Sequence, residues 1–581
     1  MPWKISRRFC LSVGSYVWLA LTAIATRGAT LRTLCEKDIF PKFRHSKGLI
    51  DYFLANIVFA KEMKEFPHKL SVSGWDIRKT KAHQITGFSG TNDFRTVLPL
   101  SVHQMDLEKQ VHTNALVLDF LLQNKNTIEL RPAQDAILLP GSEEYGKANS
   151  SYFSAFENEL QPWCIAQPSN VAQVQSLVTA IRPHILSGLC HVAIRGAGHT
   201  PFAGSANING GVTIDMRRLK GITLHEEGSI VEIGVGETWA TVYAELEKQG
   251  LTTTGARVGR VGVAGFILGG GLSMFSTRTG FACDSVTEFQ IVLASGGLNN
   301  FGIVTSFKMK TLKSGKIWGG ITYYEPGAFS QLLEKTCEFV ENETDHDTHI
   351  MCSAGYGFGH QAVSCVMYHT QGKENAPSLR RFTSIEPQIQ QMCSMRTSTH
   401  LEFSEELSKF SSDGIRQYWA SITIHADFAL MELFHDKWQE TLAQIKDAEG
   451  FIFSFGFHPL TKALLKNSEK AGGNAAAIPP SDGPLFVLLI NPIWALPEDD
   501  ARIFKAVGAL VSELRGLAQE RGLLHRYVFT NYAFGEDDIV SGYGEESVAK
   551  LIATSKRVDP QSVFQWGVPG GFKLPNLNRA V

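Results

Sequence analysis

Two glycine-rich segments constrain the fold of this chain more than any other feature of its sequence. The first, HVAIRGAGHTPFAG, covers residues 191–204, and the second, RVGVAGFILGGGLS, lies within residues 257–273. Gly196 and Gly198 can adopt positive φ, so successive backbone N–H groups of the first segment can converge on one anion. Two such cradles suit a long dinucleotide with a pyrophosphate, whereas the simpler interpretation is that the glycines only mark tight turns.

Neither segment fits the two commonest nucleotide-binding motifs. A Walker loop ends in Gly-Lys-Ser or Gly-Lys-Thr, and both segments lack that ending. A Rossmann fingerprint opens a helix, but the stretch TPFAGSANINGG that begins at Thr200 has no helical pattern. The sequence therefore predicts a nucleotide site of another type.

The remaining pattern indicates an α+β protein with a second domain inserted into the first. Residues 167–312 are rich in Gly and Val, and the second glycine segment is expected to form a loop. Aromatic-rich strands and longer helices such as residues 428–450 follow, and residues 527–574 return to the first pattern. Within the first domain the expected strands are residues 191–195, 211–216 and 228–236, and the expected helices are residues 176–185 and 238–250.

The charge balance points to a small-molecule substrate. The chain has 57 acidic and 55 basic residues and a formal net charge of −2, which gives no reason to expect nucleic acid or a stable membrane partner. No C-x-x-C pair occurs, so we expect no metal site. We expect the protein to be a monomer.

The N-terminus predicts a secretory signal peptide over residues 1–25. Lys4, Arg7 and Arg8 precede the apolar run FCLSVGSYVWLALTAIA, which ends in the small-residue pattern Ala-Ile-Ala. The alternative is a short membrane anchor, because this run is at the lower limit of a spanning helix. We expect the protein to enter the secretory pathway and to be secreted or retained in an endomembrane compartment.

Cysteines and glycosylation motifs agree with that route. Removing Cys10 with the signal leaves eight of the nine cysteines, an even number that is compatible with disulfides. Asn149 and Asn342 begin Asn-X-Ser/Thr motifs and are predicted glycosylation sites.

Several motifs, in this order, resemble one family of flavoproteins. They are PWCIAQPSNVAQVQSLV, VAIRGAGHT, GGVTIDMRRLKGI, VGVAGFILGGGLSMFSTRTGFACDSV, NNFGIVTSF and, near the C-terminus, YGEESVAKLIATSKRVDPQSVFQWGVPGGFKL. The chain resembles the berberine-bridge-enzyme-like oxidases of the vanillyl-alcohol-oxidase superfamily, especially secreted fungal FAD-linked oxidoreductases of secondary metabolism. The resemblance runs from Ala136 to Leu574.

The resemblance implies FAD as cofactor and a defined domain order. It implies a PCMH-type FAD-binding domain of two α/β subdomains and a substrate domain built on an antiparallel sheet. The implied boundaries are residues 26–135 for an atypical extension, 136–315 for the FAD domain, 316–520 for the substrate domain and 521–581 for the returning segment. The residues implied to bind FAD are Arg195, Gly196, Ala197, Gly198, His199, Thr200, Gly262, Val263, Gly265, Gly269, Gly270, Gly271, Gly302, Ile303 and Val304.

His199 falls where family members commonly bond covalently to the 8α-methyl group of the flavin. The alternative is a histidine that only hydrogen-bonds a phosphate. Many members have a second link through a cysteine, but that position is Val258 here, which implies a single link. Cys283 is interpreted as a small buried residue, and the resemblance implies a disulfide between Cys35 and Cys164.

The implied reaction is a hydride transfer from an alcohol, an amine or a similar C–H donor to FAD and then to O₂, in some members with ring closure. Asn531 and Tyr532 match a recurrent Asn-Tyr pair near the flavin ring and are the first candidates for catalysis. His425 and His458 are weaker candidates, because a lone histidine in an apolar strand is more often structural. Two alternatives stay open: a degenerate member that binds FAD poorly and acts as an accessory protein, and a secreted carbohydrate oxidase.

Two departures from the family pattern affect these expectations. Residues 36–135 match nothing in the family, and LASGGLNNFGIV, residues 293–304, lacks a strand and a helix that members usually carry there. Either feature could be natural or a gene-model error. The apolar strands on both sides of the junction look buried, and we expect them to be neighbours joined by a tight turn. We also expect the shortened chain to bind FAD more weakly.

Overall fold

The computed structural model describes residues 136–293, 300–342, 344–535 and 537–575. They all belong to one compact unit, residues 99–581. The predicted signal peptide, the extension 26–135, Cys35 and most of the shortened junction lie outside the described residues, so those predictions remain predictions. No helix in the described ranges is long and apolar enough to cross a membrane, and no group of metal-binding side chains occurs there.

The first sheet is small and positions the first glycine segment. Its strands, in order across the sheet, are β1 (Ile137–Leu138), β2 (Cys164–Ala166), β4 (Val212–Asp215) and β3 (Val192–Arg195). The last three strands are parallel, and helix α7 (Val171–Leu186) makes the crossover from β2 to β3. Two shorter helices, α5 (Glu143–Asn149) and α6 (Ala155–Asn158), lie between β1 and β2 in the sequence. The glycine loop begins directly where β3 ends.

The second sheet is antiparallel. Its strands are β5 (Ile222–His225), β6 (Ile230–Gly234), β9 (Ile303–Lys313) and β7 (Leu251–Thr253), with β8 (Val286–Val292) also paired to β9. The accompanying helices are α8 (Trp239–Glu247), α9 (Val263–Leu268) and α10 (Ser276–Thr279). Trp239, Val242, Tyr243 and Leu246 form one buried face of α8, at the spacing expected of an amphipathic helix.

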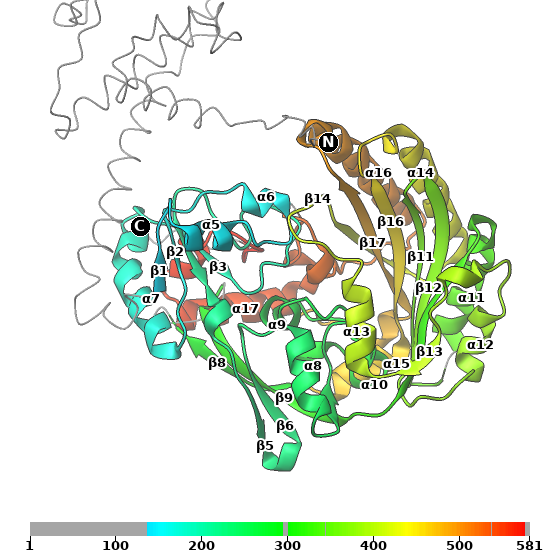
Figure 1. The fold of residues 1–581 in the computed structure, drawn as a ribbon, viewed down its shortest axis with the longest axis horizontal. Coiled ribbons are helices and arrows are strands. Elements are labelled where there is room, and N and C mark those ends of the chain that lie inside the picture. Colours follow the sequence, from blue (N-terminus) through cyan, green and yellow to red (C-terminus); the bar gives the residue numbers. More distant parts are fainter. Residues whose placement is uncertain (1–135, 294–299, 343, 536, 576–581) are drawn as a thin grey trace, which may run out of the picture. The chain divides into compact units, whose positions relative to one another are not determined.

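The third sheet is the largest and is antiparallel throughout. Its strands are β13 (Arg396–Ser398), β10 (Ile317–Tyr324), β12 (His360–His369), β11 (Thr348–Gly357), β16 (Ile452–Leu460), β17 (Leu485–Trp494) and β14 (Arg416–Gln417), with β15 (Ala420–His425) also paired to β17. Four helices lie along one face (Figure 1): α11 (Phe329–Asn342), α12 (Pro377–Thr383), α14 (Phe428–Ile445) and α16 (Asp500–Glu520). Helices α13 (His400–Ser408) and α15 (Lys462–Lys470) complete this region.

Strand alternation gives this sheet two different faces. In β16, the rings of Phe453 and Phe455 pack against Trp438 of α14, with ring centroids 5.4 and 5.8 Å apart. The intervening Ser454 and the later His458 point to the opposite face, where they line a cavity. One face is therefore a dry helix-covered core, and the other is available for a site.

The C-terminal segment returns to the first sheet. It contains α17 (Glu545–Val558) and α18 (Val563–Trp566), and the Val192 N–H of β3 donates to the Gly567 carbonyl at 2.6 Å. The Gln565 amide also donates to the Asn300 side chain at 2.9 Å. The predicted α+β fold, with an inserted region built on an antiparallel sheet and a segment that returns to the first sheet, is therefore confirmed.

Two local predictions were wrong. The second glycine segment is not wholly a loop, because Val263, Phe266 and Ile267 are buried at helical spacing within α9. The second prediction was wrong only in part. The strands beside the junction are neighbours, as expected, with Val292 paired to Ile303. However, β8 is largely exposed, including Phe289 at 38%, because its only pairing among the described strands is with β9.

Candidate active site

A cavity of about 710 Å³ lies where the two glycine segments, the uncovered face of the third sheet and the C-terminal segment meet. Its lining includes 196–200, Arg257, Val258, Gly262, Gly265, Gly269, Asn300, Phe301, Met351, Ser353, Gln417, Trp419, His458, Asn491 and 529–533. Most predicted FAD-binding residues of the glycine segments are therefore brought together. Six predicted residues lie outside this lining: Val263, Gly270, Gly271, Gly302, Ile303 and Val304. In the region of the last three, the residues that line the cavity are Asn300 and Phe301.

Backbone conformation requires a glycine in the first loop. Gly198 has φ of +76°, and a Cβ there would lie 2.7 Å from Tyr152 Cδ1 and 2.9 Å from Arg195 Nε. The Gly198 carbonyl accepts from the Phe153 N–H at 3.1 Å. The loop is therefore held close against the protein behind it, and its other side faces the cavity.

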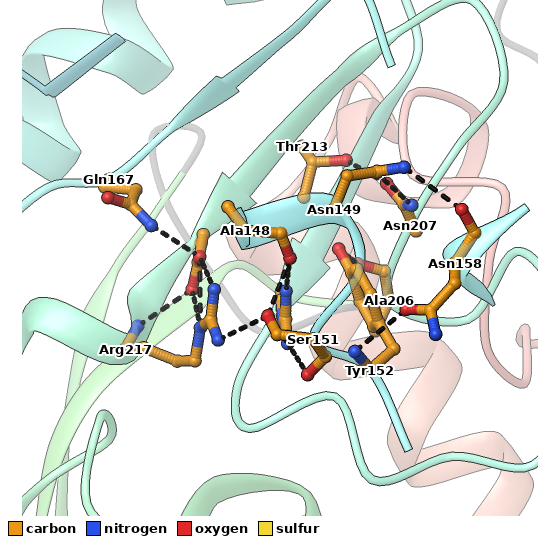
Figure 2. Close-up of polar contacts among 12 residues, drawn as sticks. Ala148, Asn149, Ser151, Tyr152, Asn158, Gln167, Ala206, Asn207, Thr213 and Arg217 are labelled. Atoms are coloured by element: carbon orange, nitrogen blue, oxygen red, sulfur yellow. Dashed lines mark hydrogen bonds and ion pairs between the residues drawn. The ribbon is translucent and has the colours of Figure 1, made fainter. Parts of the chain in front are cut away.

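Arg195 supports the loop from behind and does not line the cavity, contrary to the prediction. Its buried guanidinium donates to the Ala148 and Ser151 carbonyls at 2.8 and 2.5 Å and lies 3.5 Å from the centre of the Tyr152 ring. Figure 2 shows Ala148, Ser151 and Tyr152 within this network. Arg195 is a structural residue, because its Nη1 and Nη2 donors are used within the protein.

The same network argues against glycosylation at Asn149. Its buried amide donates to the Asn158 carbonyl at 3.1 Å and accepts from Asn207 at 3.0 Å, as Figure 2 illustrates for these side chains. A glycan would replace one of the two N–H donors, which go to the Asn158 and Leu160 carbonyls, and this buried site has no room for a sugar. Asn342 instead lies exposed at the end of α11, where it donates to the Glu338 carbonyl at 3.1 Å, and it remains a predicted site.

The second glycine segment packs directly on the first. A Cβ at Gly262 would lie 2.5 Å from Ala197 Cβ, and a Cβ at Gly269 would lie 2.6 Å from the Asn531 amide nitrogen. A side chain at Gly262 would separate the two segments, and one at Gly269 would push Asn531 away from the second segment. The glycines therefore serve close approach between backbones, which the sequence interpretation anticipated only in part.

His199 faces the cavity from the first loop. Its ring stacks on Phe153 with centroids 3.8 Å apart, and its Nε2 lies 3.3 Å from Ser411 Oγ. Burial in this environment lowers the pKa of His199 to about 4. The imidazole is therefore neutral at neutral pH and has a free electron pair for hydrogen bonding or for bond formation.

The predicted catalytic pair divides between two roles. The Asn531 side chain accepts from the Gly271 N–H at 3.1 Å and donates to the Gly265 and Phe266 carbonyls at 3.3 and 3.2 Å. These bonds occupy both amide donors and the oxygen, which favours Asn531 as a residue that positions the second glycine segment. Because Asn531 also lines the cavity, its catalytic role stays a prediction.

Tyr532, in contrast, presents its hydroxyl to the cavity. The oxygen accepts from Arg257 Nη2 at 2.5 Å and lies 3.5 Å from His458 Nδ1. Arg257 Nη1 already donates to His458 Nδ1 at 3.0 Å, so His458 Nδ1 is occupied and the Tyr532 oxygen is left to meet a ligand. The edge of Trp419 meets the Tyr532 ring at 5.6 Å and fixes its orientation.

The two weaker histidine candidates have different outcomes. His458 is buried in the cavity wall, and its pKa lies well below 6.5 because of burial and the nearby Arg257 and His349. His425 lies outside the lining, 5.7 Å from the His525 ring, so the structure does not support it as a catalytic base.

Arg257 and Gln417 were missed by the sequence analysis. Arg257 is 8% exposed, and it is the only Lys, Arg, Asp or Glu among the described residues of the lining. Gln417 is fully buried; its Oε1 accepts from Trp419 Nε1 at 3.0 Å, while its Nε2 has no acceptor within the described part of the chain. For the part of the cavity wall that carries Ser454 and His458, the sequence did offer a signal: every second residue from Phe451 to Phe457 in FIFSFGFHPL is aromatic.

These residues fit FAD. Both glycine segments bring bare backbone to the cavity, and no carboxylate among the described lining residues would repel the phosphates of a dinucleotide. Gln417 borders the same space, although its buried Nε2 has no acceptor among the described residues. Val258 lines the cavity without a reactive atom, so His199 is the one family-type attachment point there.

Comparisons with known proteins agree with this geometry. Residues 162–302 match the FAD binding domain family model. The chain is 31% identical over 456 residues to the FAD-dependent monooxygenase tpcD of Cochliobolus heterostrophus, covering 73% of this chain and 87% of that protein. It is 30% identical over 461 residues to the FAD-dependent monooxygenase FUP4 of Fusarium proliferatum, covering 74% and 88%. The solved structure of the BBE-like protein number 28 from Arabidopsis thaliana has a TM-score of 0.62 at 16% identity, covering 78% of this chain and 99% of that one.

Proposed function

We propose that this chain, which belongs to the family of fungal FAD-dependent monooxygenases and shares the fold of the BBE-like proteins, is an oxidase of a small organic alcohol or amine. The observation that carries the proposal is the Tyr532 hydroxyl, held 2.5 Å from the Arg257 guanidinium inside the cavity. A base in that place can take the proton of a substrate hydroxyl or ammonium group while hydride leaves the adjacent carbon.

The protein residues prepare the proton transfer. FAD, when bound, supplies the hydride acceptor and passes the electrons to O₂. The positive charge of Arg257 stabilises negative charge on the Tyr532 oxygen, since the two groups are in direct hydrogen-bond contact. His458 accepts from Arg257 and keeps the guanidinium in place. Tyr532 is therefore the proposed base, and His458 is a positioning residue.

We also propose that His199 forms the covalent link to FAD. The imidazole is neutral and faces the cavity beside the first glycine loop. Such a link would replace one imidazole N–H and one methyl C–H bond by a C–N bond, and O₂ would accept the two electrons. Acid-precipitated wild-type protein should retain its yellow colour, whereas His199→Ala should release its flavin. Free FAD in the wild-type supernatant would exclude the link.

The oxidase proposal is tested by measuring O₂ consumption and H₂O₂ release with a panel of aromatic and aliphatic alcohols and amines. We expect one H₂O₂ for each O₂ consumed. The name of the two curated relatives, FAD-dependent monooxygenase, favours a second candidate, in which one oxygen atom enters the product. Labelling with ¹⁸O₂ separates them: label in the product with little H₂O₂ would replace the oxidase by a monooxygenase.

A further inference from the structure

Arg257 is a buried cation whose partners are all uncharged. Nη1 donates to His458 Nδ1 at 3.0 Å and to Met351 Sδ at 3.1 Å, and Nη2 donates to the Tyr532 hydroxyl at 2.5 Å. A guanidinium has five N–H donors, so two remain without an acceptor within the described residues. No carboxylate of the described chain lies within ion-pair distance of it. Burying a charge without a counter-charge is unfavourable, and such a group recruits an anion when one is available.

The histidines and Tyr368 around Arg257 do not supply that anion. The titratable side chains that face it are His349 of β11, Tyr368 of β12, His458 of β16 and Tyr532. Burial and Arg257 itself hold the pKa of both histidines well below 6.5, so both are neutral. Burial raises the pKa of Tyr368, so this hydroxyl is also neutral at neutral pH. The Tyr532 oxygen, the proposed base, uses only one of the N–H donors, so the two unused donors are left for a molecule that enters the cavity.

The position of the cation favours the substrate over the phosphates of FAD. Its acceptors are side chains of β11, β16 and the segment around Tyr532, so the guanidinium is held by side chains and not by the backbone of the glycine segments. Aromatic and apolar groups accompany it: Trp419 lies against Tyr532, and Phe410, 65% exposed, lies in the lining. An aromatic body with one ionised oxygen complements this arrangement.

We propose that Arg257 is a specificity-determining residue that binds an ionised oxygen, a carboxylate or an acidic phenolate, on an aromatic substrate. The inference rests on the proposed function only in that it takes this cavity to be the substrate site beside FAD. The anion completes the ion pair with the two unused N–H donors and places the substrate against Tyr532. The protein thus selects anionic aromatic substrates over neutral ones of the same shape.

Ligand binding tests the proposal without requiring turnover. The purified flavin-loaded protein is titrated with benzoate and with benzamide, its neutral analogue, and binding is followed by the change in the visible flavin spectrum. A second pair, 4-cyanophenolate and 4-cyanoanisole, identifies a preference for phenolate over carboxylate. We expect the wild type to bind at least one anion about tenfold or more tightly than its neutral partner, a difference that corresponds to one charge-assisted contact.

Variants then assign the preference. Arg257→Met should abolish it and Arg257→Lys should retain part of it. Arg260→Met is the matched control, because Arg260 already has a carboxylate partner in Asp413, and it should leave the preference unchanged. If Arg257→Met does not fold, the wild-type ratio decides, and a ratio near one for both pairs overturns the proposal.

An unchanged preference in Arg257→Met also overturns the proposal. If the flavin reduction potential shifts in that variant at the same time, the charge is assigned to the flavin. A failed oxidase proposal would look different, because the protein would then bind no flavin or release no H₂O₂ with any substrate.

Discussion

The cavity has two walls that are built in different ways. The wall formed by 196–200 and 262–269 presents backbone, and its glycines are required where a Cβ would meet Ala197 or Asn531 at 2.5–2.6 Å. The wall formed by the third sheet presents side chains, with Ser353, Ser454 and His458 at alternate strand positions above an aromatic core. A wall of bare backbone is suited to a cofactor, because the chemical structure of the cofactor is constant. Side chains on a rigid sheet can be exchanged to fit a different substrate without disturbing the core beneath.

The largest expected effect tests whether the chemistry takes place at the side-chain wall, to which Tyr532 is joined through Arg257 and His458. Tyr532→Phe removes the hydroxyl that Arg257 contacts but keeps the ring against Trp419. We expect kcat to fall by about 10²- to 10⁴-fold, the usual contribution of a general base. Flavin content should stay at the wild-type level, as measured by absorbance per polypeptide. A kcat within threefold of wild type would remove Tyr532 from the reaction.

The next prediction concerns the anchor behind the backbone wall. Glu157 is fully buried, and its carboxylate accepts from the Gly204 and Ala206 N–H groups at 3.1 and 2.6 Å. Burial raises its pKa from 4.5 to about 7. Because the folded-state pKa lies above the unfolded value, the folded chain binds this proton more tightly. The Glu157 contribution to the free energy of unfolding should therefore fall by roughly 3 kcal/mol as the pH rises through this interval.

Urea denaturation at a series of pH values measures this effect. The test is the difference between variant and wild type, because buried histidines such as His199 make the total stability rise with pH in the same interval. The unfolding free energy of Glu157→Gln relative to wild type should rise by roughly 3 kcal/mol between pH 4.5 and about 7. Glu159→Gln, two residues further on and partly exposed beside Arg416, is the control, and its difference from wild type should not change with pH. A pH-independent difference for Glu157→Gln would contradict the assignment to Glu157.

A smaller effect tests the need for bare backbone. Gly262→Ala would place a Cβ 2.5 Å from Ala197 Cβ, and the two glycine segments would have to separate. We expect a loss of about 1–3 kcal/mol in unfolding free energy, as for other overpacked sites, with reduced flavin content. Gly146→Ala in α5 is the matched control, since nothing lies within 4 Å of its Cβ and it should be neutral or slightly stabilising. Equal flavin content in both variants would show that the close approach is dispensable.

The difference between the walls also explains what could be predicted from the sequence. The backbone wall depends on local signals, so the loop around His199, the helix α7 and the strand β3 were anticipated from short stretches. The side-chain wall depends on contacts between distant positions: Arg257 meets Tyr532 across 275 residues and His458 across 201. No local pattern encodes that convergence, and Arg257 was therefore missed.

Local patterns also failed where two explanations share one signal. The glycines around α9 were interpreted as loop markers, but Val263, Phe266 and Ile267 bury a helical face between them. The apolar residues of β8 suggested burial, although only one side of this strand is paired among the described strands. An Asn-Tyr motif fixes the position of its two residues, but it does not reveal that their side chains point to opposite walls.

That last point gives the smallest predicted effect and the sharpest test of the two-wall description. Asn531 uses its amide to hold Gly265, Phe266 and Gly271, so Asn531→Ala leaves the Gly271 N–H without its partner. We expect a loss of about 1–2 kcal/mol in unfolding free energy, together with weaker flavin retention. Because the second glycine segment occupies the Asn531 amide, kcat per bound flavin should change by less than about threefold, in contrast to Tyr532→Phe. Asn531→Asp keeps the acceptor for Gly271 but turns a carboxylate oxygen toward the Gly265 and Phe266 carbonyls, so it should be no more stable than Asn531→Ala. Stopped-flow reduction rates normalised to flavin content distinguish the roles. A reduction rate in Asn531→Ala more than tenfold below wild type would place both residues of the pair on the reacting wall.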